Sequence, residues 1–276
     1  MTIKLMILDL DGTLLNDQKI ITERNKKVLE KLHENNVKIA FASGRTNFMM
    51  RFYQEPYVKC DYHLAFNGAM IQNLKTGEML EQITVSDQSA RKVWQYLADN
   101  ADTYTCYSKD CMYFYDMTKN TVKNKYKKYT DIAKAENIIL KQKVIKLDKY
   151  EIPQKIDPIF KFVTYEKNEK WLSNFRQYIE TIPDLTMEAT GYDVTGVFDQ
   201  KVSKENAVLK IAKQLNINKS EICAFGDYDN DLSMFNAAGI KVAMQNATEA
   251  LKDQADYICP NNNQDGVARI IEENLL

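Results

Sequence analysis

The chain has 276 residues, of which 45% are hydrophobic and 27% charged, with 9 Gly and 5 Pro. This composition excludes a disordered chain, a collagen-like chain and a small disulfide scaffold, and the length favours two compact units or one unit with a large insertion. The 37 basic and 38 acidic side chains nearly cancel, so no overall charge attracts the chain to nucleic acid or to an anionic membrane.

The N-terminal segment and the cysteines bear on location. No apolar run reaches the roughly 18 residues that a membrane helix needs, and the apolar segment after Met1 ends at Asp9, so we expect neither a membrane span nor a signal peptide. The five cysteines are an odd number, and their spacing fits neither a zinc site nor a CxxC redox pair. We therefore expect reduced thiols in a cytoplasmic protein.

The first and last parts of the chain alternate strand-like and helical segments. In the first part we predict strands at 3–8, 37–41 and 62–66, with helices at 22–35 and after Arg45. In the last part we predict a helix from Ser203, strands at 222–225 and 240–243, and helices from Asp229 and after Asp265. This alternation predicts an α/β fold with a Rossmann-like parallel sheet and helices on both faces.

The middle of the chain has a different pattern. Two extended runs at 103–107 and 112–115 indicate a hairpin, and a further strand is predicted at 159–165. We predict an inserted α+β domain at 84–191, with the core formed by 1–83 and 192–276. Breaker residues at 73–77 and 190–191 mark the expected edges.

A lysine-rich segment lies inside this insertion. Residues 119–149 carry ten lysines against three acidic residues. A solvated helix face explains the charge, and a patch that steers anionic substrates is the alternative. A nucleic-acid-binding role is a weaker possibility, because no recognised binding motif accompanies the lysines.

Two acidic residues stand where the first buried strand should end. Asp9 and Asp11 follow four apolar residues, and strand alternation predicts that their side chains start on the same side. Two such carboxylates repel unless they share a cation or a proton, and Mg²⁺ suits oxygen ligands. An Asx turn bent at Gly12 is the alternative, but it does not explain Asp9.

Three further segments follow predicted strands or open predicted helices. Ser43-Gly44-Arg45 offers a hydroxyl and N–H groups at a helix start, where anions bind, although Ser is also an ordinary N-cap. Lys204 falls in the first turn of a helix, where the dipole disfavours a cation and a bound anion offsets the cost. The segment 226–231 places Asp227, Asp229, Asn230 and Asp231 together, more than capping requires, without the spacing of an EF-hand.

Together these four segments, in this order, resemble the haloacid dehalogenase (HAD) superfamily, and within it the Cof-type, sugar-phosphatase-like branch. The motifs are Asp9-x-Asp11-Gly12-Thr13, Ser43-Gly44-Arg45, Lys204 and Gly226-Asp227-x-x-Asn230-Asp231. Asn67-Gly68-Ala69, Asn246-Ala247 and Asp265-Gly266-Val267 are further similarities, and the resemblance covers nearly the whole chain.

The resemblance implies a role for each motif residue. Asp9 is the expected nucleophile, which forms an aspartyl-phosphate, and Asp11 is the expected general acid and base, a role that needs a raised pKa. Mg²⁺ is expected on the Asp9 carboxylate, the Asp11 carbonyl and Asp227, with Asp231 nearby. The expected contacts to phosphoryl oxygens are made by Gly12, Thr13, Ser43, Gly44, Lys204 and Asn230.

The insertion is expected to be the cap that selects the substrate. Two positions depart from the family pattern, since relatives often carry an acidic residue near Gly196 and usually Gly in place of Gln245. Lys201 competes with Lys204, but Lys204 lies 23 residues before Asp227, as in the family, and follows Ser203.

The predicted function is a Mg²⁺-dependent phosphatase of small phosphorylated metabolites, either sugar phosphates or phosphorylated cofactors. A phosphomutase that uses the same intermediate is one alternative, and a non-catalytic phosphometabolite-binding regulator is another. We expect no nucleic-acid or membrane partner and a monomer or weak homo-oligomer.

Overall fold

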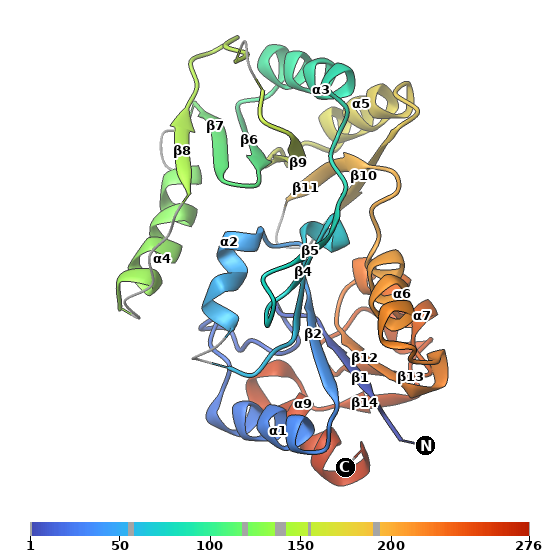
Figure 1. The fold of residues 1–276 in the computed structure, drawn as a ribbon. Helices are drawn as coiled ribbons and strands as arrows, with labels where there is room; N and C mark the ends of the chain where they lie inside the picture. Colours follow the sequence, from blue (N-terminus) through green and yellow to red (C-terminus); the bar gives the residue numbers. More distant parts are fainter. Residues whose placement is uncertain are drawn as a thin grey trace. The chain divides into compact units, whose positions relative to one another are not determined.

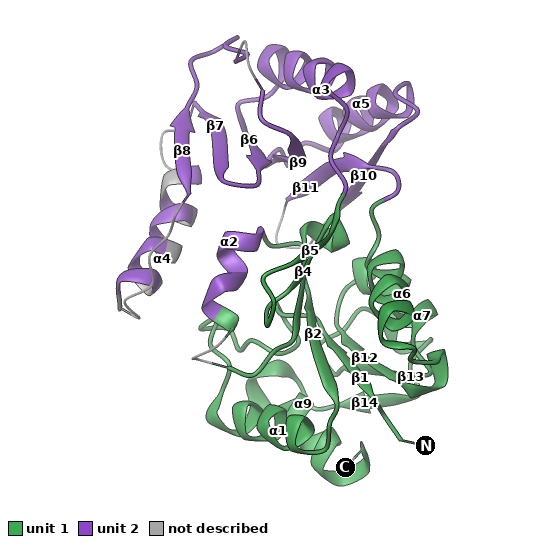
Figure 2. Ribbon diagram, in the orientation of Figure 1, with its two compact units in different colours: residues 1–45, 53–82, 202–276 green, residues 46–52, 83–201 purple. Residues whose placement is uncertain are grey.

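The computed structural model describes residues 2–54, 58–117, 121–135, 142–153, 156–189 and 194–275. The chain forms two compact units, coloured separately in Figure 2. The first unit comprises residues 1–45, 53–82 and 202–276, and the second comprises residues 46–52 and 83–201. Among the described residues, no helix has the length and apolar character needed to cross a membrane.

An eight-stranded sheet forms the centre of the first unit, in the order β14-β13-β12-β1-β2-β3-β4-β5 (Figure 1). The six strands from β14 to β3 are parallel, and β4 and β5 extend the sheet as antiparallel strands. The strands are β1 (Leu5–Leu8), β2 (Lys38–Ala42), β3 (Tyr62–Ala65), β4 (Met70–Asn73), β5 (Met79–Gln82), β12 (Ile222–Gly226), β13 (Ile240–Met244) and β14 (Tyr257–Cys259).

Helices cover both faces of this sheet. On one face α1 contacts α9, and on the other α6 contacts α7 (Figure 1). Side-chain caps start the longer helices: the Thr22 hydroxyl accepts from the Asn25 N–H, and the Ser203 hydroxyl accepts from the Asn206 N–H. The helices are α1 (Glu23–Glu34), α6 (Lys204–Leu215), α7 (Leu232–Ala237), α8 (Glu249–Lys252) and α9 (Gly266–Ile270), with short helical turns at Phe66–Gly68, Lys219–Glu221, Asp229–Asp231, Asn262–Gln264 and Ile271–Leu275.

The buried strands explain this arrangement. All four residues of β1 have no exposed surface, because a central parallel strand is covered on both faces and needs a continuous apolar run. The predicted Rossmann-like α/β core with helices on both faces is confirmed.

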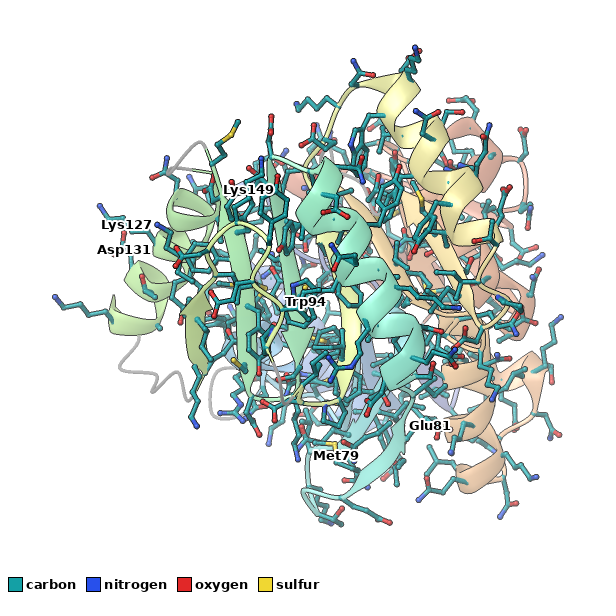
Figure 3. The ribbon with its side chains drawn as sticks, turned by 90° about the horizontal axis from the view of Figure 1, so that it is seen from above. Met79, Glu81, Trp94, Lys127, Asp131 and Lys149 are labelled. Carbon is teal, nitrogen blue, oxygen red and sulfur yellow. The ribbon has the colours of Figure 1, made fainter. Side chains whose placement is uncertain are left out.

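The second unit has its own sheet, in the order β10-β11-β9-β6-β7-β8, antiparallel except for the β7–β8 pair. Trp94 is fully buried in its core and packs edge-on against Tyr113 and Phe162 of the strands beneath α3 (Figure 3). The predicted hairpin is β6–β7. The elements are α2 (Asn47–Met50), a short turn at Arg51–Tyr53 that ends in the first unit, α3 (Asp87–Asn100), β6 (Thr103–Ser108), β7 (Cys111–Asp116), α4 (Thr121–Ala135), β8 (Lys143–Lys146), β9 (Ile159–Thr164), α5 (Glu169–Glu180), β10 (Leu185–Ala189) and β11 (Thr195–Asp199).

The compact units differ from the expected domains in two places: residues 46–52, expected in the core, belong to the second unit, and the core resumes later than expected. We expected the core to resume at residue 192, but β11 pairs with β9 and β10 in the second sheet, and the first unit resumes at Val202. The expected junction itself lies outside the described residues. At the other end the division falls at 82/83, close to the expected 83/84. The breaker residues at 73–77 form the turn of the β4–β5 hairpin.

The lysine-rich segment is described only in part. Lys127 and Asp131 of α4 and Lys149 after β8 are exposed (Figure 3). Residues 119–120 and 136–141 of this segment lie outside the described residues. The exposed side chains agree with a solvated face, and a role in steering substrates remains a hypothesis.

His63 is a buried titratable group in β3. Its side chain is 2% exposed, its Nε2 lies 3.2 Å from the Tyr53 carbonyl oxygen, and its ring stacks on Phe41 with 6.0 Å between the ring centroids. Burial lowers the pKa of His63 to about 4, and the hydrogen bond to Tyr53 offsets only part of this effect.

We expect His63 to weaken the fold in acid. Since an unfolded histidine has a pKa near 6.5, the unfolded state binds more protons than the folded state between about pH 6.5 and pH 4, and stability falls as the pH decreases through this interval. The slope from one group is at most about 1.4 kcal/mol per pH unit. Urea denaturation from pH 7 to pH 5 should show a shallower decline for His63→Gln than for wild type. His33→Gln is the matched control, and equal slopes for wild type and His63→Gln would contradict the prediction.

Candidate active site

Two acidic residues stand where neighbouring central strands end. Asp9 follows β1 and Asp227 follows β12, and these strands are parallel, with Leu8 opposite Phe225. The Asp9 N–H donates to the Phe225 carbonyl at 3.1 Å. Because parallel strands end at the same edge of a sheet, both carboxylates lie at that edge.

Asp231 completes a cluster of three carboxylates. One oxygen from each of Asp9, Asp227 and Asp231 lies within 4.8 Å of the other two. Asp231 is fully buried, and its Oδ2 accepts from the N–H groups of Asp227 (2.9 Å) and Tyr228 (3.2 Å). The fourth acid, Asp229, instead accepts from the Thr248 hydroxyl at 2.8 Å, near the surface.

Two glycines leave room for these carboxylates. A Cβ added to Gly12 would lie 2.2 Å from Asp227 Oδ2, and the backbone there is left-handed, with φ +84°. A Cβ added to Gly226 would lie 2.6 Å from Asp231 Cβ. The cluster therefore requires glycine at both positions.

Lys204 is the cation of the cluster. Its Nζ, buried at the start of α6, donates to Asp9 Oδ1 at 2.7 Å and to Asp231 Oδ1 at 2.5 Å. These carboxylates offset the cost of a cation in the first turn of a helix. Lys201 is exposed, so the structure places Lys204 rather than its rival in the cluster.

The cluster carries more negative than positive charge. Burial, together with the charge of Asp231, raises the pKa of Asp9 to about 7 although Lys204 opposes the shift. Burial and the charges of Asp9 and Asp231 raise the pKa of Asp227 to about 9. Burial alone would lower the pKa of Lys204, but the two carboxylates outweigh it and raise that pKa.

This donor set fits a divalent cation. All the donors are oxygens, and burial with the charges of neighbouring carboxylates raises the pKa of Asp9 and of Asp227. Mg²⁺ is a hard cation that prefers oxygen ligands and is bound through few carboxylates. The residues present therefore match the metal that the sequence predicts.

Asp11 does not join this cluster. Arg45 binds both of its carboxylate oxygens, with Nε 2.5 Å from Oδ2 and Nη2 2.7 Å from Oδ1, and Lys19 Nζ lies 2.7 Å from Oδ1. Arg45 also donates to the Tyr53 hydroxyl at 3.0 Å, and Tyr53 donates to the Lys19 carbonyl at 3.1 Å. These contacts give Asp11 two cationic partners of its own.

One expectation for Asp11 is wrong in this conformation. A carboxyl with a raised pKa was expected. Burial alone would raise its pKa, but Arg45 and Lys19 outweigh burial and hold the pKa of Asp11 well below its usual range. The shared side of the Asp9 and Asp11 side chains stays a prediction.

Three of the expected phosphoryl-binding residues, Thr13, Ser43 and Asn230, lie in the segments that follow β1, β2 and β12 of the same sheet. Ser43 follows β2, is 2% exposed, and its hydroxyl accepts from the Arg45 N–H at 3.2 Å across Gly44. The Thr13 hydroxyl donates to Asp227 Oδ1 at 3.0 Å, and its N–H donates weakly to the Leu10 carbonyl. Asn230 Nδ2 lies 3.5 Å from Asn67 Oδ1.

Sequence reasoning missed several residues that support the site. The sequence predicted no role for Lys19 or Tyr53. It predicted Arg45 only as part of the Ser43-Gly44-Arg45 motif and did not identify Asp11 as its partner. The left-handed backbone of Lys19 (φ 64°) cannot be predicted from the sequence, because lysine does not favour this conformation. Asn246, noted only as a similarity, donates to the Gly12 carbonyl at 2.8 Å and supports the turn.

Comparisons with known proteins show which family the chain resembles. The family model described as haloacid dehalogenase-like hydrolase matches residues 6–271. The putative phosphatase YxeH of Bacillus subtilis is 28% identical, covering 99% of this chain and 98% of its own. The pyridoxal phosphate phosphatase YbhA of Escherichia coli is 24% identical over the whole of both chains.

A solved structure shares the fold. A haloacid dehalogenase-like hydrolase from B. subtilis aligns with a TM-score of 0.83 at 24% identity, covering 99% of this chain and 100% of that one. With the family model spanning nearly all of the sequence, this chain belongs to the haloacid dehalogenase-like hydrolases, in their Cof-type phosphatase branch.

Proposed function

We propose that this enzyme is a Mg²⁺-dependent phosphatase that hydrolyses phosphomonoesters of small metabolites through an aspartyl-phosphate on Asp9. The observation that supports this proposal best is the cluster of Asp9, Asp227 and Asp231 around Lys204 at the ends of β1 and β12. Attack on a phosphate dianion needs a nucleophilic carboxylate together with positive charge that reduces the repulsion between the two anions. Lys204 and a metal site beside Asp9 would supply that charge.

The metal ligands of this proposal come from the family resemblance, and the contacts decide the part of Asp231. We assign Mg²⁺ to the carboxylates of Asp9 and Asp227 and to the main-chain carbonyl of Asp11. Asp231 already accepts from Lys204 and from two backbone N–H groups, so we assign it to orienting Asp227 and Lys204 and to contacting the ion through water. When bound, Mg²⁺ supplies positive charge that lets one anion approach another.

In the first step, an Asp9 carboxylate oxygen attacks phosphorus. The bond from phosphorus to the leaving oxygen breaks, and that oxygen takes a proton from the Asp11 carboxyl. Lys204 neutralises charge beside Asp9, and Ser43 and Asn230 bind the phosphoryl oxygens. Proton donation requires Asp11 to loosen its contacts with Arg45 and Lys19, since these contacts favour the carboxylate.

In the second step, the aspartyl-phosphate is hydrolysed. Asp11, then a carboxylate, takes a proton from water, the resulting hydroxide attacks phosphorus, and the bond to Asp9 breaks to release phosphate. The contacts with Arg45 and Lys19 hold Asp11 as a carboxylate, the form that accepts a proton in this step, but they also lower its basicity, so this step too requires Asp11 to loosen them.

We propose sugar phosphates or phosphorylated cofactors as the substrates. The name of the E. coli relative supports including pyridoxal phosphate among them. We assign selection of the leaving group to the second unit, which interrupts the first unit in the sequence as a cap does. The cytoplasm is the proposed location, supported by five cysteines that are all free and buried.

The nucleophile is tested by Asp9→Asn. With Mg²⁺, we expect wild type to release inorganic phosphate from at least one member of a panel of sugar phosphates, pyridoxal phosphate and p-nitrophenyl phosphate, and EDTA to abolish the release. Asp9→Asn should lower the turnover about a thousand-fold or more, because no covalent intermediate forms. Its melting temperature serves as the folding control.

Other outcomes of this assay would contradict the proposal. A phosphorylated isomer formed without stoichiometric phosphate would indicate a mutase. A substrate-induced rise in melting temperature with no turnover of any compound would indicate a non-catalytic binder.

Gly12→Ala tests the room left for Asp227. The added Cβ must displace the Asp227 carboxylate, so we expect a higher Mg²⁺ concentration for half-maximal activity and a turnover reduced about a hundred-fold. Gly77→Ala is the matched control, since Gly77 has a similar φ of +74° but nothing within 4 Å of an added Cβ. If both variants lose activity equally, backbone strain rather than Asp227 is responsible.

A further inference from the structure

A strained turn follows β3 in the first unit. Phe66 (φ 53°), Asn67 (φ 58°) and Gly68 (φ 96°) are left-handed in succession, and a phenylalanine side chain disfavours this backbone, whereas asparagine and glycine adopt it more readily. All three are buried. Such strain persists only where the surroundings hold it, and it is frequent at functional sites.

The surroundings of this turn are the motif segments themselves. The N–H of Phe66 donates to the Arg45 carbonyl at 2.8 Å, and the N–H of Asn67 donates to the Ser43 carbonyl at 2.9 Å. Gly68 lies so close to the start of α6 that an added Cβ would be 2.7 Å from the Ser203 carbonyl oxygen. The turn therefore joins the loop of Ser43 to the helix that carries Lys204.

The side chain of Asn67 reaches Asn230, in the segment 226–231. It is 2% exposed, and its Oδ1 faces Asn230 Nδ2 at 3.5 Å. The Asn230 amide nitrogen has two N–H groups, so a contact of one with Asn67 leaves the other to donate elsewhere and fixes the plane of the amide.

We propose that Asn67 is a positioning residue, which orients the Asn230 amide toward the phosphoryl group. This inference rests on the proposed function, in which Asn230 binds phosphoryl oxygens. The left-handed turn places Asn67 Oδ1 against Asn230 Nδ2. The N–H groups of Phe66 and Asn67 also donate to carbonyls of the loop that carries Ser43, and so hold that loop in place. In this scheme Asn67 contacts Asn230 and not the substrate.

A purely structural role makes a different prediction. If Asn67 serves only to adopt the left-handed backbone, glycine serves as well or better. If it positions Asn230, glycine preserves the turn and removes the acceptor. Asn67→Gly thus separates folding from positioning, and Asn216→Gly, at the left-handed C-cap of α6 (φ 53°), is the matched control.

The experiment measures binding of inorganic phosphate, in the presence of Mg²⁺, by calorimetry together with the melting temperature. Asn67→Gly should weaken phosphate binding about tenfold, the size of one lost hydrogen bond, and leave the melting temperature at or above that of wild type. Asn216→Gly should change neither phosphate binding nor KM. In turnover assays, Asn67→Gly should raise KM more than it lowers kcat.

A double-mutant cycle completes the test. Asn230→Ala should weaken phosphate binding, and adding Asn67→Gly should weaken it no further, because the residue that Asn67 positions is gone. Additive losses, unchanged binding in Asn67→Gly, or no phosphate binding by wild type would each overturn the proposal. Since binding is measured without turnover, a phosphate-binding protein that fails to hydrolyse phosphomonoesters would refute the proposed function and leave the positioning role standing.

Discussion

The site depends on three carboxylates that share one buried ammonium group. Lys204 donates to both Asp9 and Asp231, whereas Asp227 accepts from the neutral Thr13 hydroxyl, and burial with the charges of Asp9 and Asp231 raises its pKa to about 9. An arrangement of this kind is stable with protons or with a cation, and a divalent cation removes the conflict without protonating the nucleophile. The proposed Mg²⁺ and the proposed nucleophile thus share one electrostatic origin.

The backbone around the cluster is shaped to keep these charges close. Gly12 and Gly226 replace side chains that would occupy the space of Asp227 and Asp231, and Asn246 holds the Gly12 carbonyl. The turn after β1 has a left-handed backbone at Gly12 (φ +84°). This turn is held because β1 is buried on both faces and fixes where the turn begins. A rigid central sheet is what allows a site of mutually repelling groups to persist.

Patterns that repeat along the chain were predictable. The alternation of strands and helices, the caps Thr22 and Ser203, and the acids after β1 and β12 all follow from local rules. The sheet to which β11 belongs was not predictable, because Thr195–Asp199 is a short buried strand like those of the core, and only its pairing with β9 and β10 assigns it to the second sheet. The cluster itself was predictable because parallel strands end at one edge of a sheet.

The two aspartates of the first motif show where such rules stop. Burial raises the pKa of Asp9, whereas Arg45 and Lys19 outweigh burial at Asp11, two residues away, and lower its pKa. Sequence spacing predicts their proximity but not their partners, because Lys19 and Arg45 lie on other turns, which Tyr53 joins by hydrogen bonds. A carboxyl whose pKa is held this low is a poor general acid and a weak base near neutral pH, so both proposed proton transfers depend on Asp11 loosening its contacts with Arg45 and Lys19.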